Sequence, residues 1–165
     1  MKLVTLRDLY LHELRDLYDT EMRVEESLAE MAETATSPEL KQAFEDHLAE
    51  TRNHVSRLEQ IFGMLQEKPK RHKSKGIQGI VGEGEDLMDE DAAPAVTDAA
   101  LITSAQRVEH YEIAAYGAVR TYARRLGFED QAQLLQRTLD EEGQADKRLT
   151  ALAESYANEE ANSAR

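Results

Sequence analysis

The stretch VEHYEIAAYG, Val108 to Gly117, places three ionisable side chains in a segment that is otherwise apolar or aromatic. Glu109, His110 and Glu112 fall within four consecutive positions. Charged groups in an apolar helix raise the free energy of folding unless a partner satisfies them. The stretch therefore leaves three alternatives: a solvated helix face, a network of ion pairs, or a set of metal ligands.

The composition of the whole chain limits the class of protein and the partners that it can bind. The 165 residues are 41% hydrophobic and carry a net charge of −13, which suits one soluble domain with a sizeable core. The acidic balance repels phosphate backbones, so we expect no nucleic acid partner, and it favours cations. The absence of cysteine excludes disulfides, thiolate zinc sites and iron–sulfur clusters. No apolar run is long enough for a membrane span, and early acidic residues argue against a signal peptide, so we expect a cytoplasmic protein without a membrane partner.

Apolar residues recur every three or four positions along most of the chain, which is typical of amphipathic α-helices. Four long helices are predicted, at about 6–34, 38–66, 98–126 and 129–156. The first is expected to begin with a capping box between Thr5 and Asp8. Either Thr36 or Ser37 is expected to cap the second, and Gly127 is expected to end the third.

A breaker-rich crossover at about 68–96 separates the two predicted helix pairs. Its first part is basic, and the remainder is rich in glycine and acidic residues, with apolar positions for one short helix. Two antiparallel pairs joined by a long crossover are one of the connectivities of four-helix bundles. The sequence therefore predicts an all-α, ferritin-like four-helix bundle, with one domain over residues 1–158 and a frayed tail at 159–165.

An internal repeat relates the two helix pairs. A shift of 91 residues superposes the first pair on the second without a gap. It aligns Glu21 with Glu112 and Glu50 with Glu141. The alternative is chance similarity between amphipathic helices. A genuine repeat predicts carboxylates at matching places in the two pairs.

Acidic residues interrupt the apolar stripes near the middle of the helices, and two histidines accompany them on the helix at 38–66. The candidate metal ligands are Glu21, His47, Glu50, His54, Glu109, Glu112, Glu142 and Asp146. Buried carboxylates repel one another and are costly to desolvate, while most Lys and Arg residues fall on the outer faces. Two metal ions with bridging carboxylates would remove the conflict. Oxygen and imidazole ligands suit iron, which we expect first, or manganese. The alternatives are a solvated face and pairing with arginine.

The candidate set departs from the usual ferritin-like pattern. There, two helices each contribute a Glu and the other two contribute a Glu-x-x-His pair. Asn53 stands three residues after Glu50, so the nitrogen ligand is either His47, three residues before it, or His54, four residues after it. The helix at 129–156 has no histidine.

Four stretches together resemble a known family. VEHYEIAAYG is similar to the YciE/YciF family of ferritin-like proteins, as are LYDTE at 17–21, FEDHLAET at 44–51 and LDEEGQADKRLTALA at 139–153. The resemblance covers nearly the whole chain. It implies a rubrerythrin-like bundle with a di-metal centre, a link to bacterial stress responses, and a homodimer. The ligands that it implies are Glu21, Glu50, Glu109, Glu112 and Glu142.

Two classes of function follow. In the first, the chain is a di-metal oxidoreductase (a peroxidase, a ferroxidase or a catalase-like enzyme) whose substrate is a small oxidant such as peroxide or oxygen. In the second, it is a non-enzymatic helical stress protein, metal-binding or metal-free, that partners another stress protein. The resemblance leaves both open.

Overall fold

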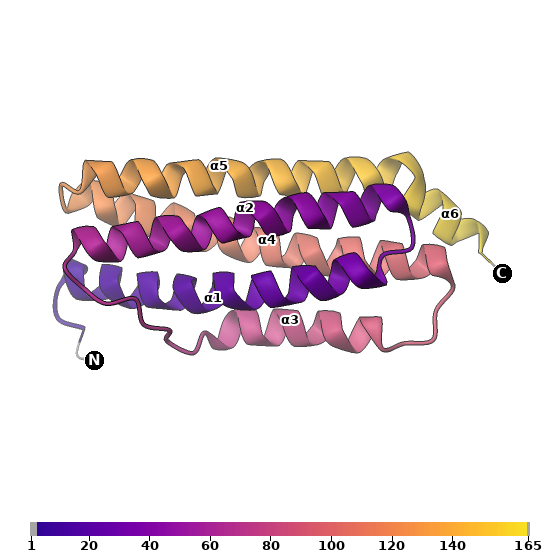
Figure 1. Ribbon diagram of the computed structural model, residues 1–165, viewed down its shortest axis with the longest axis horizontal. Coiled ribbons are helices and arrows are strands. Elements are labelled where there is room, and N and C mark those ends of the chain that lie inside the picture. Colours follow the sequence, from indigo (N-terminus) through magenta and orange to yellow (C-terminus); the bar gives the residue numbers. More distant parts are fainter. Residues whose placement is uncertain (1–2, 165) are drawn as a thin grey trace.

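The computed structural model describes residues 3–164, and every regular element in that range is a helix. Four long helices lie alongside one another (Figure 1): α1 (Leu6–Thr34), α2 (Pro38–Met64), α4 (Pro94–Arg125) and α5 (Glu129–Leu152). The crossover contains α3 (Lys75–Met88), which packs against α4 and α1. The expected all-α class is therefore confirmed. Among the described residues, no helix combines the length and the apolar character that a membrane span requires.

The ends of the long helices follow from local side-chain chemistry. The hydroxyl of Thr5 accepts a hydrogen bond from the backbone of Asp8 at 3.1 Å, and the carboxylate of Asp8 accepts one from the backbone of Thr5 at 2.8 Å. This is the predicted capping box. Ser37 caps α2 by accepting a hydrogen bond from the backbone of Leu40 at 3.1 Å. Gly127 follows α4 with a φ of +78°, a left-handed conformation that glycine adopts without steric strain.

The start of α4 differs from the prediction. The helix begins at Pro94 rather than at Asp98, because proline suits the first turn of a helix, where no N–H donor is needed. Asp98 is instead a buried residue within α4. Its carboxylate accepts hydrogen bonds from the backbone N–H groups of Thr36 at 2.7 Å and Ser37 at 2.9 Å. The side chain thus ties α4 to the turn between α1 and α2.

The end of the chain also differs from the prediction. After α5 the chain continues through a π-helical segment, η1 (Ala153–Ala157), into α6 (Asn158–Ser163), where we expected a frayed tail (Figure 1). The reason lies in η1: Ala157 is fully buried, and the hydroxyl of Tyr156 shares a hydrogen bond with that of Ser37. These contacts hold the last turns against the bundle. Residues 1, 2 and 165 of the predicted domain and tail lie outside the described residues.

Replacing Asp98 by alanine is expected to lower the free energy of unfolding by about 3 kcal/mol. The substitution removes two hydrogen bonds to a charged group and leaves two backbone donors unpaired. Urea unfolding followed by circular dichroism measures the change. Asp91→Ala, at an exposed position before α4, is the matched control and should stay within about 0.5 kcal/mol of wild type. Equal effects of the two substitutions would show that Asp98 does not hold the turn.

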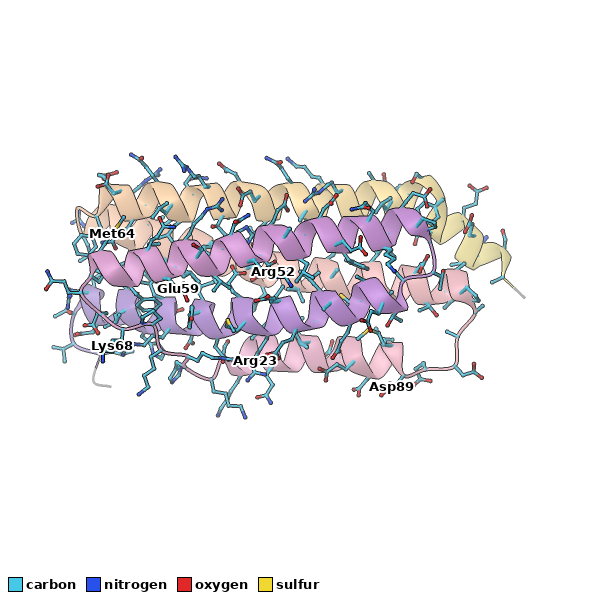
Figure 2. The ribbon with its side chains drawn as sticks, in the orientation of Figure 1. Arg23, Arg52, Glu59, Met64, Lys68 and Asp89 are labelled. Carbon is cyan, nitrogen blue, oxygen red and sulfur yellow. The ribbon has the colours of Figure 1, made fainter. Side chains whose placement is uncertain are left out.

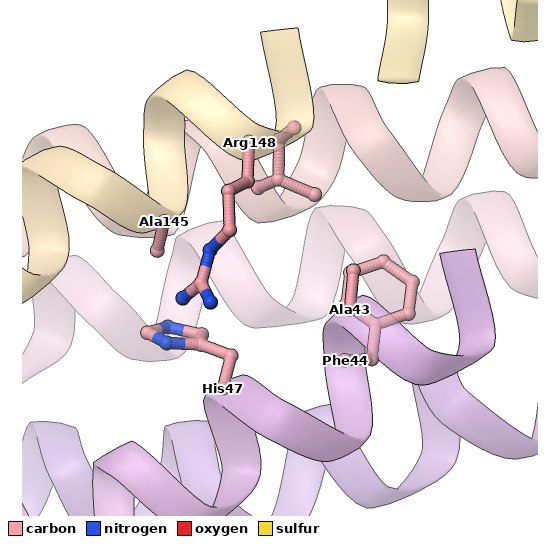
Figure 3. A pocket seen from close by; sticks show the side chains of 6 residues that line it. Ala43, Phe44, His47, Ala145 and Arg148 are labelled. Atoms are coloured by element: carbon pink, nitrogen blue, oxygen red, sulfur yellow. The ribbon is translucent and has the colours of Figure 1, made fainter. Parts of the chain in front are cut away.

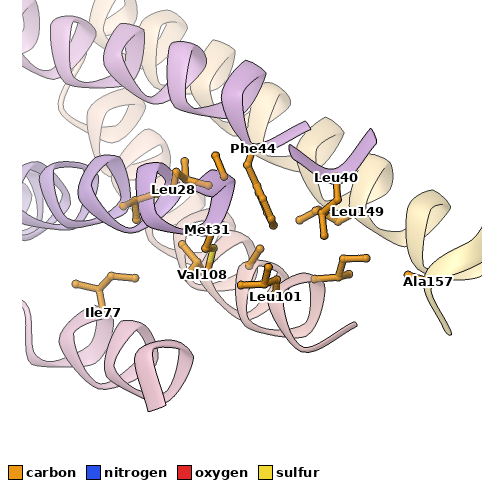
Figure 4. Packing of buried hydrophobic residues seen from close by; sticks show 13 residues of the cluster. Leu28, Met31, Leu40, Phe44, Ile77, Leu101, Val108, Leu149 and Ala157 are labelled. Atoms are coloured by element: carbon orange, nitrogen blue, oxygen red, sulfur yellow. The ribbon is translucent and has the colours of Figure 1, made fainter. Parts of the chain in front are cut away.

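The hydrophobic core consists of two clusters. The cluster around the turn between α1 and α2 (Figure 4) includes Leu28, Met31, Phe44, Leu101, Val108 and Leu149. The cluster at the other end includes Tyr10, Leu14, Phe62, Tyr116, Val119 and Leu135. On all four long helices, buried polar residues occupy the positions between the two clusters; on α4 they are Glu109 and Glu112. The fold therefore encloses a polar layer at mid-length.

Charged side chains cover the outer faces of the helices, among them Arg52 and Glu59 of α2 (Figure 2). Some form exposed ion pairs, such as that between Arg52 and Glu25 at 2.9 Å. Exposed pairs of this kind contribute about 0–1 kcal/mol each. The stability of the fold therefore comes mainly from the two apolar clusters, which must also offset the burial of the polar layer between them.

Candidate metal centre

The polar layer brings together six of the eight predicted ligands. Each of the six exposes at most 4% of its surface. They are Glu21 from α1, His47 and His54 from α2, Glu109 and Glu112 from α4, and Glu142 from α5. The sequence left open which histidine belongs to the site. The structure places both there, because positions seven residues apart lie on one face of a helix.

Two groups of three side chains share Glu142. In one, Nδ1 of His54 lies 2.9 Å from Oε1 of Glu142 and 3.5 Å from Oε2 of Glu21. In the other, Nε2 of His47 lies 2.9 Å from Oε1 of Glu109 and 3.7 Å from Oε2 of Glu142. Glu142 thus directs one oxygen to each histidine and joins the two groups.

Several atoms of these side chains are buried without a hydrogen-bond partner among the described residues. They are Oε2 of Glu21, Oε2 of Glu109, Oε2 of Glu142 and both carboxylate oxygens of Glu112. Nε2 of His47 and Nδ1 of His54 each lie 2.9 Å from a glutamate oxygen, but not in hydrogen-bond geometry. Unpaired buried polar atoms are rare in folded proteins, and a cluster of them needs an explanation such as an ion. Carboxylate oxygens and imidazole nitrogens are ligands that iron and manganese accept. The residues therefore fit metal ions.

The second ring nitrogen of His54 contacts a carboxylate at the edge of the bundle. Nε2 of His54 lies 2.9 Å from Oε2 of Glu141, and Nη2 of Arg57 donates to Oε1 of Glu141 at 2.9 Å. Metal-ligating histidines usually have such a carboxylate partner, which fixes the ring orientation and raises the basicity of the ligand. Glu141 and Glu142 are neighbours in sequence, yet one orients a histidine and the other faces the centre.

A matching arrangement surrounds His47, and here the structure departs from the prediction for Glu50. Glu50 is 31% exposed and lies 3.4 Å from Nδ1 of His47, while Arg148 donates to it at 2.7 Å. Arg148 lies over the imidazole of His47 (Figure 3). Because the shift of 91 residues aligns Glu50 with Glu141 and Arg57 with Arg148, the two ion pairs follow the internal repeat. Glu50 is therefore placed at the edge, where Arg148 neutralises it.

Replacing Glu141 by alanine is expected to weaken metal binding about 10–100-fold, the usual effect of removing a carboxylate that orients a histidine ligand. A competition titration with a chromophoric chelator measures the affinity. Asp140→Ala is the matched control, because Asp140 is the preceding residue, is exposed, and bonds to Gln136 on its own helix. An unchanged affinity in Glu141→Ala would mean that Glu141 does not support the site.

Asp146 also lies outside the buried cluster. It is 21% exposed, accepts a hydrogen bond from Gln106 at 3.1 Å and lies 3.3 Å from Nε2 of His110. Its position one turn after Glu142 directs it to the boundary between α4 and α5. The prediction that Asp146 faces the centre is therefore not supported by its position.

Tyr116 is not among the predicted ligands, yet it contacts the cluster. Tyr116 is buried, and its hydroxyl donates a hydrogen bond to Oε1 of Glu21. Burial raises the pKa of Tyr116 well above its ordinary value, so the phenol stays protonated and remains a donor. The sequence spacing could have predicted this contact, because Tyr116 stands four residues after Glu112 and so lies on the same helix face.

Where no metal is bound, burial and the neighbouring charges raise the pKa values of both histidines and of two glutamates in the cluster, so these side chains hold their protons more tightly than in water. Burial alone would lower the pKa of both histidines, but the surrounding glutamates raise the pKa of His47 to about 10 and that of His54 to about 11. Burial raises the pKa of Glu142 to about 7 and that of Glu112 well above its ordinary value. A metal ion at this site must therefore displace protons from its ligands.

The fold and the site together define a class: an all-helical protein whose long helices enclose a buried carboxylate–histidine cluster. The chain belongs to the family described as a domain of unknown function, DUF892, whose model matches residues 5–162. It is 38% identical to Protein YciF of Escherichia coli (strain K12) over 162 residues, which are 98% of each chain. The resemblance to the YciE/YciF family is confirmed.

Solved structures agree with this assignment. The crystal structure of the E. coli stress protein YciF matches with a TM-score of 0.90 and 39% identity, over 96% of this chain and 99% of that chain. YcfI of Rhodopseudomonas palustris matches with a TM-score of 0.88 and 39% identity, over 90% and 95%. A protein of Xanthomonas campestris, 24% identical with a TM-score of 0.72, shares the fold.

Proposed function

We propose that this protein is a ferritin-like di-metal carboxylate protein that reduces a small oxidant, peroxide or oxygen, in a bacterial stress response. The observation that carries the proposal is the burial of four glutamates and two histidines together at mid-length, with several carboxylate oxygens that have no hydrogen-bond partner among the described residues. Ferritin-like di-iron and di-manganese proteins also use four glutamates and two histidines. Here both histidines come from α2, which is the departure from the usual distribution over the helices.

The charges of the cluster support two divalent ions. Four carboxylates carry four negative charges, and two divalent ions with neutral imidazoles would balance them. Glu21 and His54 would hold one ion, Glu109 and His47 the other, and Glu142 would contact both. Glu112 lies among these glutamates with both oxygens unpaired and would complete the set. Iron remains our first expectation and manganese the second, because oxygen-rich sites with imidazole suit both.

When bound, the metal ions would supply electrons and polarise the oxidant. The protein's own groups prepare the site in three ways. Tyr116 holds one oxygen of Glu21 by a hydrogen bond, so the other oxygen is left for the centre. Glu50 and Glu141 orient the two imidazoles. The apolar clusters on both sides keep bulk water away.

The size of the hollows beside the cluster limits the substrate. One hollow of about 10 Å³ lies between α2 and α5 and is lined by His47, Phe44 and Arg148 (Figure 3). Another of about 10 Å³ lies between α1 and α4 and reaches Glu109. Each has room for about one water-sized molecule. Spaces of this size exclude an organic substrate, which is consistent with a substrate as small as peroxide or oxygen.

Elemental analysis and peroxide turnover test the proposal directly. Protein purified without a metal-affinity tag is expected to contain two iron or manganese ions per chain and, with a chemical reductant that returns the ions to the divalent state, to consume peroxide or oxygen. The double variant Glu21→Ala with Glu112→Ala should lose both the metal and the turnover. Unchanged turnover in that variant would overturn the enzymatic proposal.

A non-enzymatic role is the second candidate. It is favoured by the pairing of each histidine with buried glutamates, which compensates part of the charge without metal. In this case the protein acts as a homodimer or as a partner of another stress protein. Bound metal without turnover of peroxide or oxygen would select this candidate, and light scattering would test the homodimer.

A further inference from the structure

A second group of ionisable side chains lies at the surface, where the crossover passes α1. One ligand atom each from His12, Asp16 and His72 lies within 4.8 Å of the others. Nε2 of His12 is 4.0 Å from Oδ2 of Asp16, and Nδ1 of His72 contacts Oδ1 of Asp16. The centroids of the two imidazole rings are 4.7 Å apart. Two imidazoles and one carboxylate therefore share a small space.

The backbone places these side chains before any ion binds. His12 and Asp16 are one helical turn apart on α1, so they lie on the same face. The backbone N–H of His72 donates to the carbonyl of Arg15 at 3.2 Å. Further along the crossover, the backbone N–H of Ser74 donates to Asp19 of α1 at 3.0 Å. The segment that carries His72 is thus held against α1.

We propose that His12, Asp16 and His72 form a metal site for a divalent transition-metal ion, foremost Zn²⁺, which clamps the crossover to α1. Zinc commonly binds three protein ligands of this kind, two histidines and a carboxylate, with water in the fourth position. A hollow of about 220 Å³, lined by Leu3, His12, Arg15 and His72, leaves room for that water.

The local charges permit a cation. Arg15 and Arg71, which directly precede Asp16 and His72 in the sequence, already have acidic partners: Arg15 lies 3.4 Å from Glu67, and Arg71 donates to Asp19 at 2.7 Å. The chain as a whole carries −13, which attracts cations to its surface, whereas Lys70 and Lys73 beside His72 weaken that attraction locally. The side chains of His12 and Asp16 are about one-quarter exposed and that of His72 is 54% exposed, so an ion reaches them without crossing the core.

A zinc titration of the full chain tests the site. Untagged protein stripped with a chelator is titrated against a chromophoric chelator, and the equivalents of bound Zn²⁺ are counted for wild type, His12→Ala and His72→Ala. Each variant is expected to bind one equivalent less than wild type. Because neither substitution touches the buried cluster, any zinc bound there contributes equally to all the proteins.

His110→Ala is the matched control. His110 is 70% exposed and lies 3.3 Å from Asp146, so it offers a surface imidazole and a carboxylate without a second imidazole. This variant is expected to bind as many equivalents as wild type. The proposal is overturned if His12→Ala and His72→Ala bind as much zinc as wild type, or if His110→Ala loses an equivalent as well.

Trypsin supplies a second readout that depends on the clamp itself. Lys70, Arg71 and Lys73 surround His72 and are cleavage sites for trypsin. Free Zn²⁺ at about 100 times its Kd lowers the population of the open segment about 100-fold, so cleavage should slow by a similar factor. The protection should appear in wild type and His110→Ala and be absent in His12→Ala. Cleavage of wild type that does not respond to zinc would contradict the clamp.

Discussion

Glu142→Ala is expected to abolish binding of both metal ions at the buried centre, whereas Glu21→Ala and Glu109→Ala should each remove one. The reason is the position of Glu142 between the two histidines: Oε1 lies 2.9 Å from His54, and Oε2 lies 3.7 Å from His47. Of the two histidines, Glu21 contacts only His54, and Glu109 contacts only His47. Removing the shared carboxylate therefore affects both groups, and removing either of the others affects one.

The measurement is the number of ions retained per chain after reconstitution with Fe²⁺ or Mn²⁺ and gel filtration. Asp146→Ala is the matched control, because Asp146 lies one turn further along α5 at the edge of the site. It is expected to retain both ions. Retention of both ions by Glu142→Ala, or a complete loss in Asp146→Ala, would contradict the arrangement.

A loss of ligand must be separated from a loss of structure. Where no metal is bound, Oε1 of Glu142 lies 2.9 Å from Nδ1 of His54, whose raised pKa keeps it protonated, so Glu142→Ala removes one partner of a buried ion pair. The metal-free variant is therefore expected to be less stable than metal-free wild type, by up to about 3–5 kcal/mol. Urea unfolding of both proteins in chelator separates a loss of ligand from a loss of structure.

Helical periodicity was sufficient to predict much of this architecture. Positions spaced three and four apart identify the inward face of a helix, and the acidic residues on that face had to lie near the centre. Glu21, Glu112 and Glu142 were found in this way, and the capping box at Thr5 and Asp8 followed from local chemistry. These features depend on contacts within one helix or on its hydrophobic pattern.

The remaining features depend on contacts between helices. Glu50 sits beside the inward stripe of α2, and its placement is decided by Arg148, which comes from α5 and neutralises it at the surface. Glu141 adjoins Glu142, and only the packing of Arg57 against it shows which of the two orients a histidine. The internal repeat did pair Glu50 with Glu141, but it could not show that both are supporting carboxylates. The hydrophobic pattern of one helix does not show which side chain of another helix will pair with its residues.

The stability of the metal-free protein is expected to fall as pH rises from about 6.5 towards 10. The pKa values of His47 and His54 are raised to about 10 and about 11 from an ordinary value of 6.5, so the native state binds more protons than the unfolded chain in this range. Each histidine then contributes a decrease of up to about 1.4 kcal/mol per pH unit to the free energy of unfolding. The pKa of Glu142 is also raised, to about 7, so its loss of a proton likewise lowers the free energy of unfolding as pH rises towards 7.

The metal-loaded protein should show the opposite dependence. Ligands must lose their protons to bind an ion, so metal binding tightens as pH rises, and its contribution to stability grows with the affinity. Urea unfolding at about pH 6, 7, 8 and 9, in chelator and in excess Mn²⁺, gives the two curves, which should diverge as pH increases. His54→Gln should flatten the metal-free curve, because glutamine cannot titrate. A metal-free protein that becomes more stable between these pH values would show that the histidines are not held protonated by the buried glutamates.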